Sequence, residues 1–407
     1  MSSTGDRVAS IGELGLWVTG AVLIASAAGM RLPANLIASS SASPTPQPTA
    51  VASESASASA SLAPTPTPTP APTLSPLVRK FQAYLARRDF QFQATQTGSQ
   101  SVSGANLSLE LRTTGSMSYK AGDASETTKT TVQEKLLMTD KVYAGSYTYQ
   151  RINDGPWVKK PRQHSDIVSW GMLFSSSRLF VDTGVETKNG SALHRLEVAD
   201  PNAFSAELDT LGTITDAHVT LVFWTKDDGT PAAFRMEGTW DQPVNGAPAH
   251  VTSAQEVSFT KLSGVTITTP KNPWQWIVDD TTSIAFGVPT DWSKTDTNKA
   301  IGATTYEGAS GAILYLTFAA NGLTLDQAVA AVLAASKDPA GAQVAMTVGG
   351  EPATRFGLHR SKQKDYLVEV VALHGGEVYE IAFLGSGKDT ATDALAVQIL
   401  ATLEFTK

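Results

Sequence analysis

The 407-residue sequence contains no cysteine. This absence excludes a disulfide framework, a thiolate zinc site, an iron–sulfur cluster, a cysteine nucleophile and a lipid-modified cysteine. Basic residues are outnumbered, 31 Lys and Arg against 38 Asp and Glu, and the net charge of −7 argues against a nucleic-acid partner. Metal-ligand spacings, a phosphate-binding glycine loop and a nucleophile elbow are also missing. We therefore expect no enzyme, no cofactor and no metal site.

The histidines do not change this expectation. His194, His218 and His250 are scattered, without the spacing of metal ligands. His164, Ser165 and Asp166 are contiguous, and adjacent residues do not normally align as a nucleophile, base and orienting acid.

The first 31 residues contain an uncharged run, Leu14–Met30, followed by Arg31. Its apolar part and the small residues Ala25-Ser26-Ala27 are typical of a cleaved signal peptide. The run is also long enough, at the short end, for an uncleaved transmembrane anchor. The sequence leaves both alternatives open, and both predict that the rest of the chain is exported, outside the cytoplasmic membrane.

Aromatic residues are absent between Trp17 and Phe81, and Ser, Ala, Pro and Thr make up 34 of the 39 residues from Ala38 to Pro76. Such a composition cannot bury enough apolar surface to offset its ordering entropy. We therefore expect residues 32–76 to form a disordered N-terminal stalk, stiffened by its Thr-Pro repeats.

Residues 77–270 change from a helical to a strand period. Leu77–Arg88 has the apolar stripe of a helix. Alternating residues then predict roughly eight antiparallel strands. Asp-Gly pairs predict tight turns at 153–155 and 227–229. The segments 165–181 and 204–208 lack alternation, and we expect them to be helices that cover the sheet. The predicted strands include 107–111, 142–149, 193–198, 218–225, 232–240, 254–261 and 265–269.

This order of helix, long strands, the hairpin Tyr149–Trp157, helical insertions and the hairpin Val219–Phe234 resembles the LppX/LprG-type mycobacterial lipoproteins and, more distantly, the LolA/LolB carriers. The resemblance implies a curved antiparallel half-barrel closed by helices around an apolar cavity that carries acyl chains. One departure is that this chain has no lipobox cysteine. Any membrane attachment must then come from the apolar run itself.

Ligand-contacting side chains are expected where aromatic and aliphatic residues lie outside the predicted strands. Ordinary core packing is the alternative for each of them. The candidates are Trp170, Met172, Leu173, Phe174, Leu179 and Phe180.

Residues 271–407 carry 10 basic and 15 acidic residues and predict a second, smaller domain. Thr324 and Gln327 form a capping box before a helix that ends at Asp338-Pro339, and a second helix is expected at 389–400. The start Ile284–Trp292, the segment Val348–Ala353 and the end Ile399–Phe405 resemble the PsbP-like fold. The resemblance implies an α/β/α sandwich that serves as an interaction module.

Together these features predict an α+β chain: a curved half-barrel sheet with covering helices, then a PsbP-like sandwich. We expect the first domain to be a non-catalytic carrier or sensor of a lipid or other apolar ligand. The alternative is a membrane-tethered protein-interaction module with no small-molecule ligand, in which residues 271–407 bind a partner protein of the cell envelope.

Overall fold

The computed structural model describes the chain from Ser75 to Thr406 with internal gaps. The expectations for the leader and for most of the stalk, at residues 1–74, lie outside the described residues, as do those for helices at 165–179 and 204–208. The described residues are 75–85, 89–102, 105–118, 123–132, 135–162, 180–202, 215–244, 247–298, 303–336, 338, 340–360, 364–385 and 389–406.

Eleven strands and one helix make up the described part of residues 75–261. The helix α2 (Pro76–Leu85) begins where Ser75 Oγ accepts a hydrogen bond from the backbone N–H of Leu77 at 3.2 Å, with proline at the first helical position. The strands are β1 (Phe90–Val102), β2 (Ala105–Ser118), β3 (Asp123–Val132), β4 (Lys135–Ala144), β5 (Tyr147–Ile152), β6 (Val158–Pro161), β7 (Phe180–Lys188), β8 (Ser191–Val198), β9 (Thr215–Thr225), β10 (Pro231–Val244) and β11 (Ala247–Lys261).

The remainder of the chain adds ten strands and two helices. The helices are α5 (Leu325–Ser336) and α6 (Asp389–Leu400). The strands are β12 (Trp274–Asp279), β13 (Ile284–Val288), β14 (Ser293–Asn298), β15 (Ala303–Gly308), β16 (Gly311–Ala319), β17 (Val344–Val348), β18 (Glu351–Arg360), β19 (Asp365–His374), β20 (Glu377–Gly385) and β21 (Glu404–Phe405).

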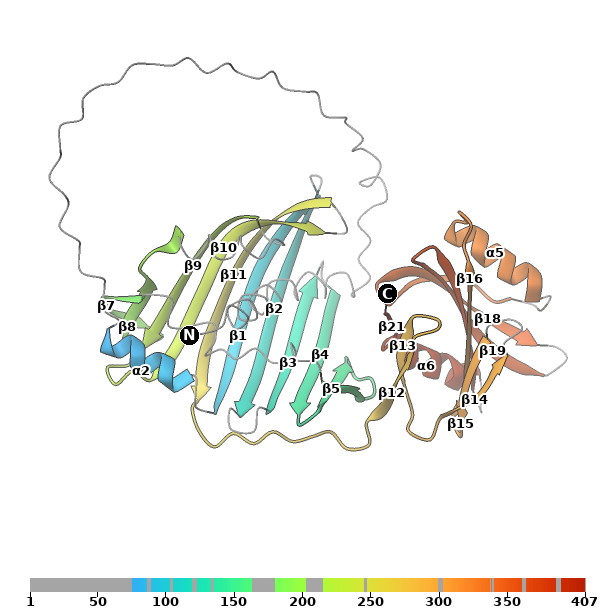
Figure 1. Cartoon of the computed structure of the whole chain (residues 1–407), viewed down its shortest axis with the longest axis horizontal. Coiled ribbons are helices and arrows are strands. Elements are labelled where there is room, and N and C mark those ends of the chain that lie inside the picture. Colours follow the sequence, from blue (N-terminus) through green and yellow to red (C-terminus); the bar gives the residue numbers. More distant parts are fainter. Residues whose placement is uncertain are drawn as a thin grey trace, which may run out of the picture.

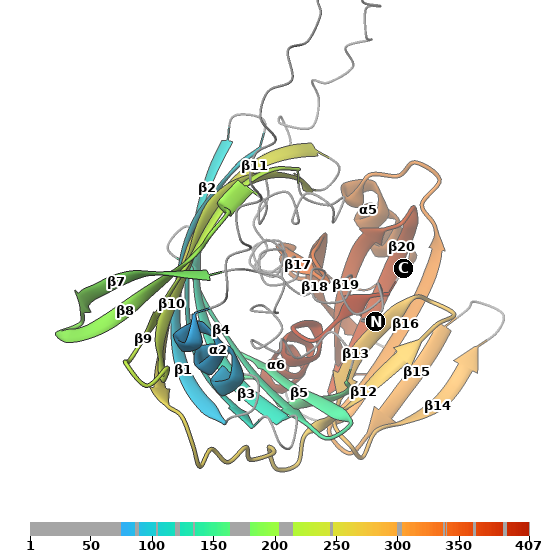
Figure 2. The same ribbon diagram turned by 60° about the vertical axis from the view of Figure 1, so that its left-hand side comes forward.

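These strands form two sheets, and the larger one crosses the predicted domain boundary. Its fourteen strands run in the order β21-β13-β12-β6-β5-β4-β3-β2-β1-β11-β10-β9-β8-β7. The seven-stranded sheet has the order β14-β15-β16-β20-β19-β18-β17. Figure 1 shows the long strands β1–β4 and β9–β11 side by side. In Figure 2 the large sheet is strongly curved and α2 lies on its concave side.

The α+β expectation with covering helices is wrong. The described residues contain twenty-one strands and three short helices, so this part of the chain is predominantly β. The physical reason is that strands, as well as helices, cover the apolar faces of the sheets. One face of the seven-stranded sheet packs against α6 together with β13 of the large sheet, through Ile284, Phe286 and Val288. An apolar sheet face can be buried by another sheet as well as by helices.

Several individual elements agree with the sequence. The capping box of α5 is confirmed, because Thr324 and Gln327 exchange backbone-to-side-chain hydrogen bonds of 2.9 and 3.3 Å. The helix predicted at 389–400 is α6, and the turn at 227–229 joins β9 to β10. Gly229 is required there: its φ is +85°, and a Cβ would lie 2.4 Å from Lys80 Cβ of α2.

Two predicted strands are wrong. The segment 142–149 is a hairpin, in which Gly145 with φ of +57° separates β4 from β5. The segment 265–269 is not a strand, because the chain there leads from β11 to β12 through Pro270 and Pro273, which have no N–H to pair in a sheet.

Candidate functional site

The concave face of the large sheet carries two rows of side chains without formal charge. Strand side chains alternate between faces, so the register of six neighbouring strands, β9-β10-β11-β1-β2-β3, decides which residues lie side by side. One row is Phe223, Phe234, Val257, Ala94, Thr113 and Thr128, and the next is Leu221, Met236, Gln255, Gln96, Leu111 and Thr130. We call these twelve side chains the neutral rows.

The aromatic end of the neutral rows is a packed cluster. The Phe223 ring is 1% exposed and lies 4.9 Å from the Phe81 ring of α2 and 5.9 Å from the Phe234 ring, centroid to centroid. Phe180, the first residue of β7, approaches Phe223 edge-on at 4.8 Å. Burial of rings of this size stabilises the fold by about 1.5–3 kcal/mol each. At this end α2 and the sheet form an ordinary hydrophobic core.

The other end of the neutral rows combines apolar surface with neutral hydrogen-bonding groups. Thr130 is 1% exposed, and both Thr113 and Gln255 are 7% exposed. The hydroxyls of Thr113 and Thr128 lie 3.0 Å apart, within hydrogen-bond distance. One row further along the same face, Ser253 Oγ accepts a hydrogen bond from Gln96 Nε2 at 3.1 Å. These side chains offer dispersion contacts and a few uncharged donors and acceptors, which is the chemistry of sites for small apolar ligands.

Charged residues of the same strands gather on the convex face. Glu110 and Arg112 of β2 form an exposed ion pair at 2.7 Å, and Arg235 and Glu237 of β10 form another at 2.5 Å. The contrast between the two faces follows directly from the alternation of residues in each strand.

On the other side of the neutral rows, the concave face becomes charged from Glu126 of β3 toward β4 and β6. Glu126 lies opposite Lys141 in the register and accepts a hydrogen bond from the Tyr143 hydroxyl at 3.1 Å. Lys160 of β6 donates to Glu404 at 2.5 Å, and its Nζ lies 3.9 Å from the centroid of the Trp276 ring. Lys160 therefore joins β6 to β12 and β21 across the β6–β12 junction.

That junction is a parallel pairing in an otherwise antiparallel sheet. Trp274 lies opposite Val158, and the backbone N–H of Trp274 donates to the carbonyl of Trp157 at 2.6 Å. Gly287 of β13 completes the contact, since a Cβ there would lie 2.7 Å from Val158 Cγ2. The first and second parts of the chain are thus connected by sheet hydrogen bonds, a feature that the sequence did not predict.

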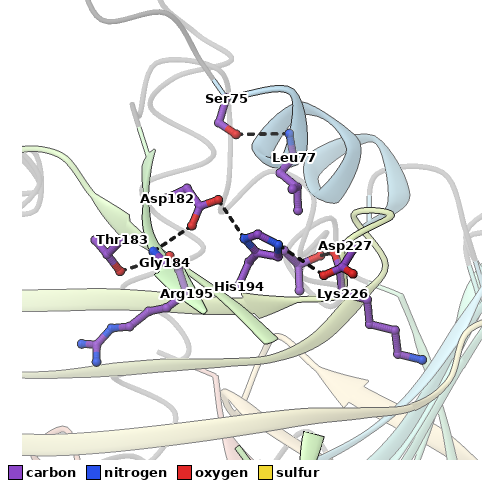
Figure 3. A network of polar contacts seen from close by, with 10 residues as sticks. Ser75, Leu77, Asp182, Thr183, Gly184, His194, Arg195, Lys226 and Asp227 are labelled. Carbon is purple, nitrogen blue, oxygen red and sulfur yellow. Dashed lines mark hydrogen bonds and ion pairs between the residues drawn. The ribbon is translucent and has the colours of Figure 1, made fainter. Parts of the chain in front are cut away.

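A second polar cluster lies at the β7 edge of the sheet (Figure 3). The two ring nitrogens of His194 face two carboxylates, Nδ1 at 2.9 Å from Asp182 and Nε2 at 3.3 Å from Asp227. Asp182 also accepts the backbone N–H of Gly184 at 3.0 Å, where the β7–β8 register shifts. The cluster fixes a bulge on an edge strand, and bulges of this kind discourage pairing with other chains. The scattered histidines of the sequence gave no sign of it.

In the described part of the chain, no group of three or more His, Asp or Glu side chains is arranged to hold a metal ion. No helix among the described residues is long and apolar enough to span a membrane.

Of the residues expected to contact a ligand, only Phe180 is described. It is 4% exposed and belongs to the cluster around Phe223, so it lies within a strand and a core rather than outside the strands. The other five, Trp170, Met172, Leu173, Phe174 and Leu179, lie outside the described residues. The sequence did not predict the neutral rows. Their one sign was that β3 carries threonine at 127, 128, 130 and 131 and no apolar residue between Ala124 and Val132.

No protein-family model and no curated protein matches the chain. Three solved structures are similar to parts of it. LprF from Mycobacterium bovis has a TM-score of 0.31 and 11% identity, over 48% of this chain and 95% of that one. Cyanobacterial PsbP from Synechocystis has a TM-score of 0.27 and 12% identity, over 35% and 98%. A DUF1329 family protein from Desulfovibrio piger has a TM-score of 0.19 and 12% identity, over 47% and 92%. At these scores the similarities do not assign the chain to a fold family.

Proposed function

We propose that the chain is a non-catalytic, extracytoplasmic binder of an apolar ligand, and that the ligand contacts the end of the neutral rows that carries threonine and glutamine, away from the core under α2. The observation that carries the proposal is the chemistry of those rows. Side chains of twelve positions on six strands include no ionisable group, although the convex face of the same strands carries several. A ligand that contacts such a surface is recognised through apolar area and a few neutral hydrogen bonds.

An acyl chain meets these requirements. Its methylene groups gain about 0.8 kcal/mol each on leaving water, and an ester or hydroxyl group can bond to the Thr and Gln side chains. The resemblance of residues 77–270 to carriers of acyl chains agrees with this ligand class. Export, and attachment to the membrane through the run at residues 14–30, belong to the same proposal.

The test uses the full chain, because β6 and β12 connect its two parts. Purified protein is extracted with organic solvent and the extract is analysed by mass spectrometry, and binding of a fluorescent acyl-chain probe is then titrated. Thr128→Trp places an indole on the neutral rows. Thr131→Trp, on the same strand but the convex face, is the matched control, because alternate residues point to opposite faces.

We expect Thr128→Trp to weaken probe binding about 10-fold or more, equivalent to about 1.4 kcal/mol, and Thr131→Trp to leave it unchanged. Circular dichroism and thermal unfolding establish that both variants fold. Equal binding by both folded variants would place the ligand elsewhere. If the extract contains no lipid and the wild-type chain binds no probe, the proposed function is wrong.

A further inference from the structure

Glu369 is an ionisable residue in the middle of an apolar cluster of the seven-stranded sheet. It lies on β19 between Leu367 and Val371, on the face that packs against α5. Its direct neighbour across the β18–β19 pair is Phe356, which is 1% exposed. Glu369 itself is only 7% exposed, and its Oε2 atom has no hydrogen-bond partner among the described residues.

The charged groups around Glu369 do not compensate its charge. On β20, Glu380 lies diagonally across from it on the same face and adds a like charge. The base that faces it from β18 is Arg360, whose guanidinium is already held by Asp365 of β19 through two hydrogen bonds, one of them 2.7 Å from Nε to Oδ1. The α5 helix carries no basic residue, and its one acidic residue is Asp326 in the first turn. Asp338, which comes after α5 in the sequence, lies close to Arg360 and adds a further negative charge.

A buried carboxylate without a partner is costly, whereas the protonated acid is neutral and has an O–H that can donate. We propose that Glu369 binds a proton in the folded protein and that loss of this proton loosens the packing of α5 on the sheet. This inference does not depend on the proposed ligand.

The electrostatics of the site agree with the geometry. Burial raises the pKa of Glu369 from 4.5 to about 7, and the charge of Glu380 adds to this increase while Arg360 opposes it. Burial also raises the pKa of Glu380. The pKa of Glu369 is higher while α5 is packed on the sheet than when water reaches the carboxyl group. The packing of α5 is therefore most stable below pH 4.5, and it loses stability as the pH rises through about 7.

The α5 helix is the element that can respond. It contacts the sheet through Ala328, Val329 and Val332, which pack against Phe356 and Val371. Phe356 is the neighbour of Glu369 on the adjacent strand, and Val371 is its neighbour on the same face of β19. An ionised Glu369 gains hydration if these contacts open and water enters. The α6 helix packs on the opposite face of the sheet, against the core that contains Phe383 and Ile381, and provides an internal reference.

The experiment is hydrogen exchange of the full chain, followed by mass spectrometry at pH 5, 6, 7 and 8, with rates normalised to the intrinsic exchange rate at each pH. Peptides that cover α5 and α6 are compared in wild type and in three variants. Glu369→Gln replaces the acid with a neutral group of the same shape, Glu380→Gln removes the nearby like charge, and Glu377→Gln changes an exposed acid of the same strand as a control.

In the wild type we expect the opening equilibrium of α5 to increase on the order of 100-fold between pH 5 and pH 8, with little change in α6. Glu369→Gln should remove most of the pH dependence and keep α5 protected at pH 8. Glu380→Gln should move the transition to lower pH, and Glu377→Gln should behave as wild type. The Glu380→Gln result also tests the proposal if Glu369→Gln does not fold.

Equal protection of α5 at all four pH values in the wild type would overturn the proposal. A pH dependence as large as that of the wild type in folded Glu369→Gln would do the same, because another group would then be responsible. Neither result bears on lipid binding, which is measured separately with the acyl-chain probe.

Discussion

On the neutral rows of the large sheet, threonines and glutamines lie among phenylalanines and leucines. A second core, formed by β13, β16, β19, β20 and α6, is almost entirely apolar. In that second core Phe286, Ile313, Val368, Val370 and Ile381 are all 0% exposed. Both regions are antiparallel sheets with alternating strands, so alternation alone does not distinguish them. What distinguishes them is whether the buried positions carry hydrogen-bonding groups.

This difference has a physical consequence. An apolar core gains its stability from permanent contact between its own side chains. A surface that mixes apolar and neutral polar groups is less suited to that purpose, since each buried hydroxyl or amide must find a partner. The second region is therefore the apolar core that stabilises the fold, and the first is the surface for which ligand binding is proposed above.

The largest expected effect comes from opening a cavity in the apolar core. Phe286 packs edge-on against Tyr315 at 5.4 Å, and Phe286→Ala should lower the free energy of unfolding by about 3–5 kcal/mol. Thr113→Val on the neutral rows removes one hydrogen bond and should cost only about 1 kcal/mol. Urea unfolding of the two variants measures both. Equal losses would mean that the neutral rows are a structural core like the other.

An intermediate effect is expected at a buried polar pair of this apolar core. The Tyr315 hydroxyl, which is buried with the rest of its side chain, donates to Asp279 Oδ2 at 2.8 Å. Asp279→Ala removes the acceptor of that hydroxyl, which keeps only its contact with Thr304, and should cost about 2–3 kcal/mol, and adding Tyr315→Phe should recover part of the loss. Additive losses in the double variant would contradict the role given to the hydrogen bond.

The pH dependence of this pair has the opposite sign to that of Glu369. Burial favours the neutral form of Asp279, but hydrogen bonds from Tyr315 and from the backbone of Thr281 and Thr282 outweigh it and lower the pKa below 3.8. Its contribution is therefore present above pH 3.8 and is lost on further acidification. Unfolding curves of wild type and Asp279→Ala should converge in acid and separate toward neutrality.

The smallest effect is expected at the junction between the regions. Lys160→Met keeps the apolar stem but removes the charge that contacts Glu404 and Trp276, and should cost about 1 kcal/mol, less at high salt. Lys159→Met is the control on the opposite face of β6. If both lysine variants lose the same stability, or if the loss from Lys160→Met does not depend on salt, the β6–β12 pairing does not rely on this contact.

How far the sequence predicts the structure depends on how local the signal is. The capping box of Thr324 and Gln327 and the turn at Gly229 were readable because their hydrogen bonds and dihedral angles involve near neighbours. Too many covering helices were predicted, because the residues of a strand do not show whether a helix or another strand will bury its apolar face. Of the expected ligand contacts, Phe180 proved to be a core residue of β7.

The sequence by itself determined many of the long strands, the position of α5 and α6, and the absence of thiol chemistry, since each depends on residue type and short-range spacing. Only the tertiary structure decided three other features. It aligned Thr113, Thr128 and Gln255 into neutral rows, because register brings together residues more than a hundred positions apart. It paired β6 with β12 across the expected domain boundary. It also placed Glu369 beside Glu380 and near an arginine, Arg360, that Asp365 already holds, because burial and cross-strand neighbours, not residue type, decide which groups surround an acid.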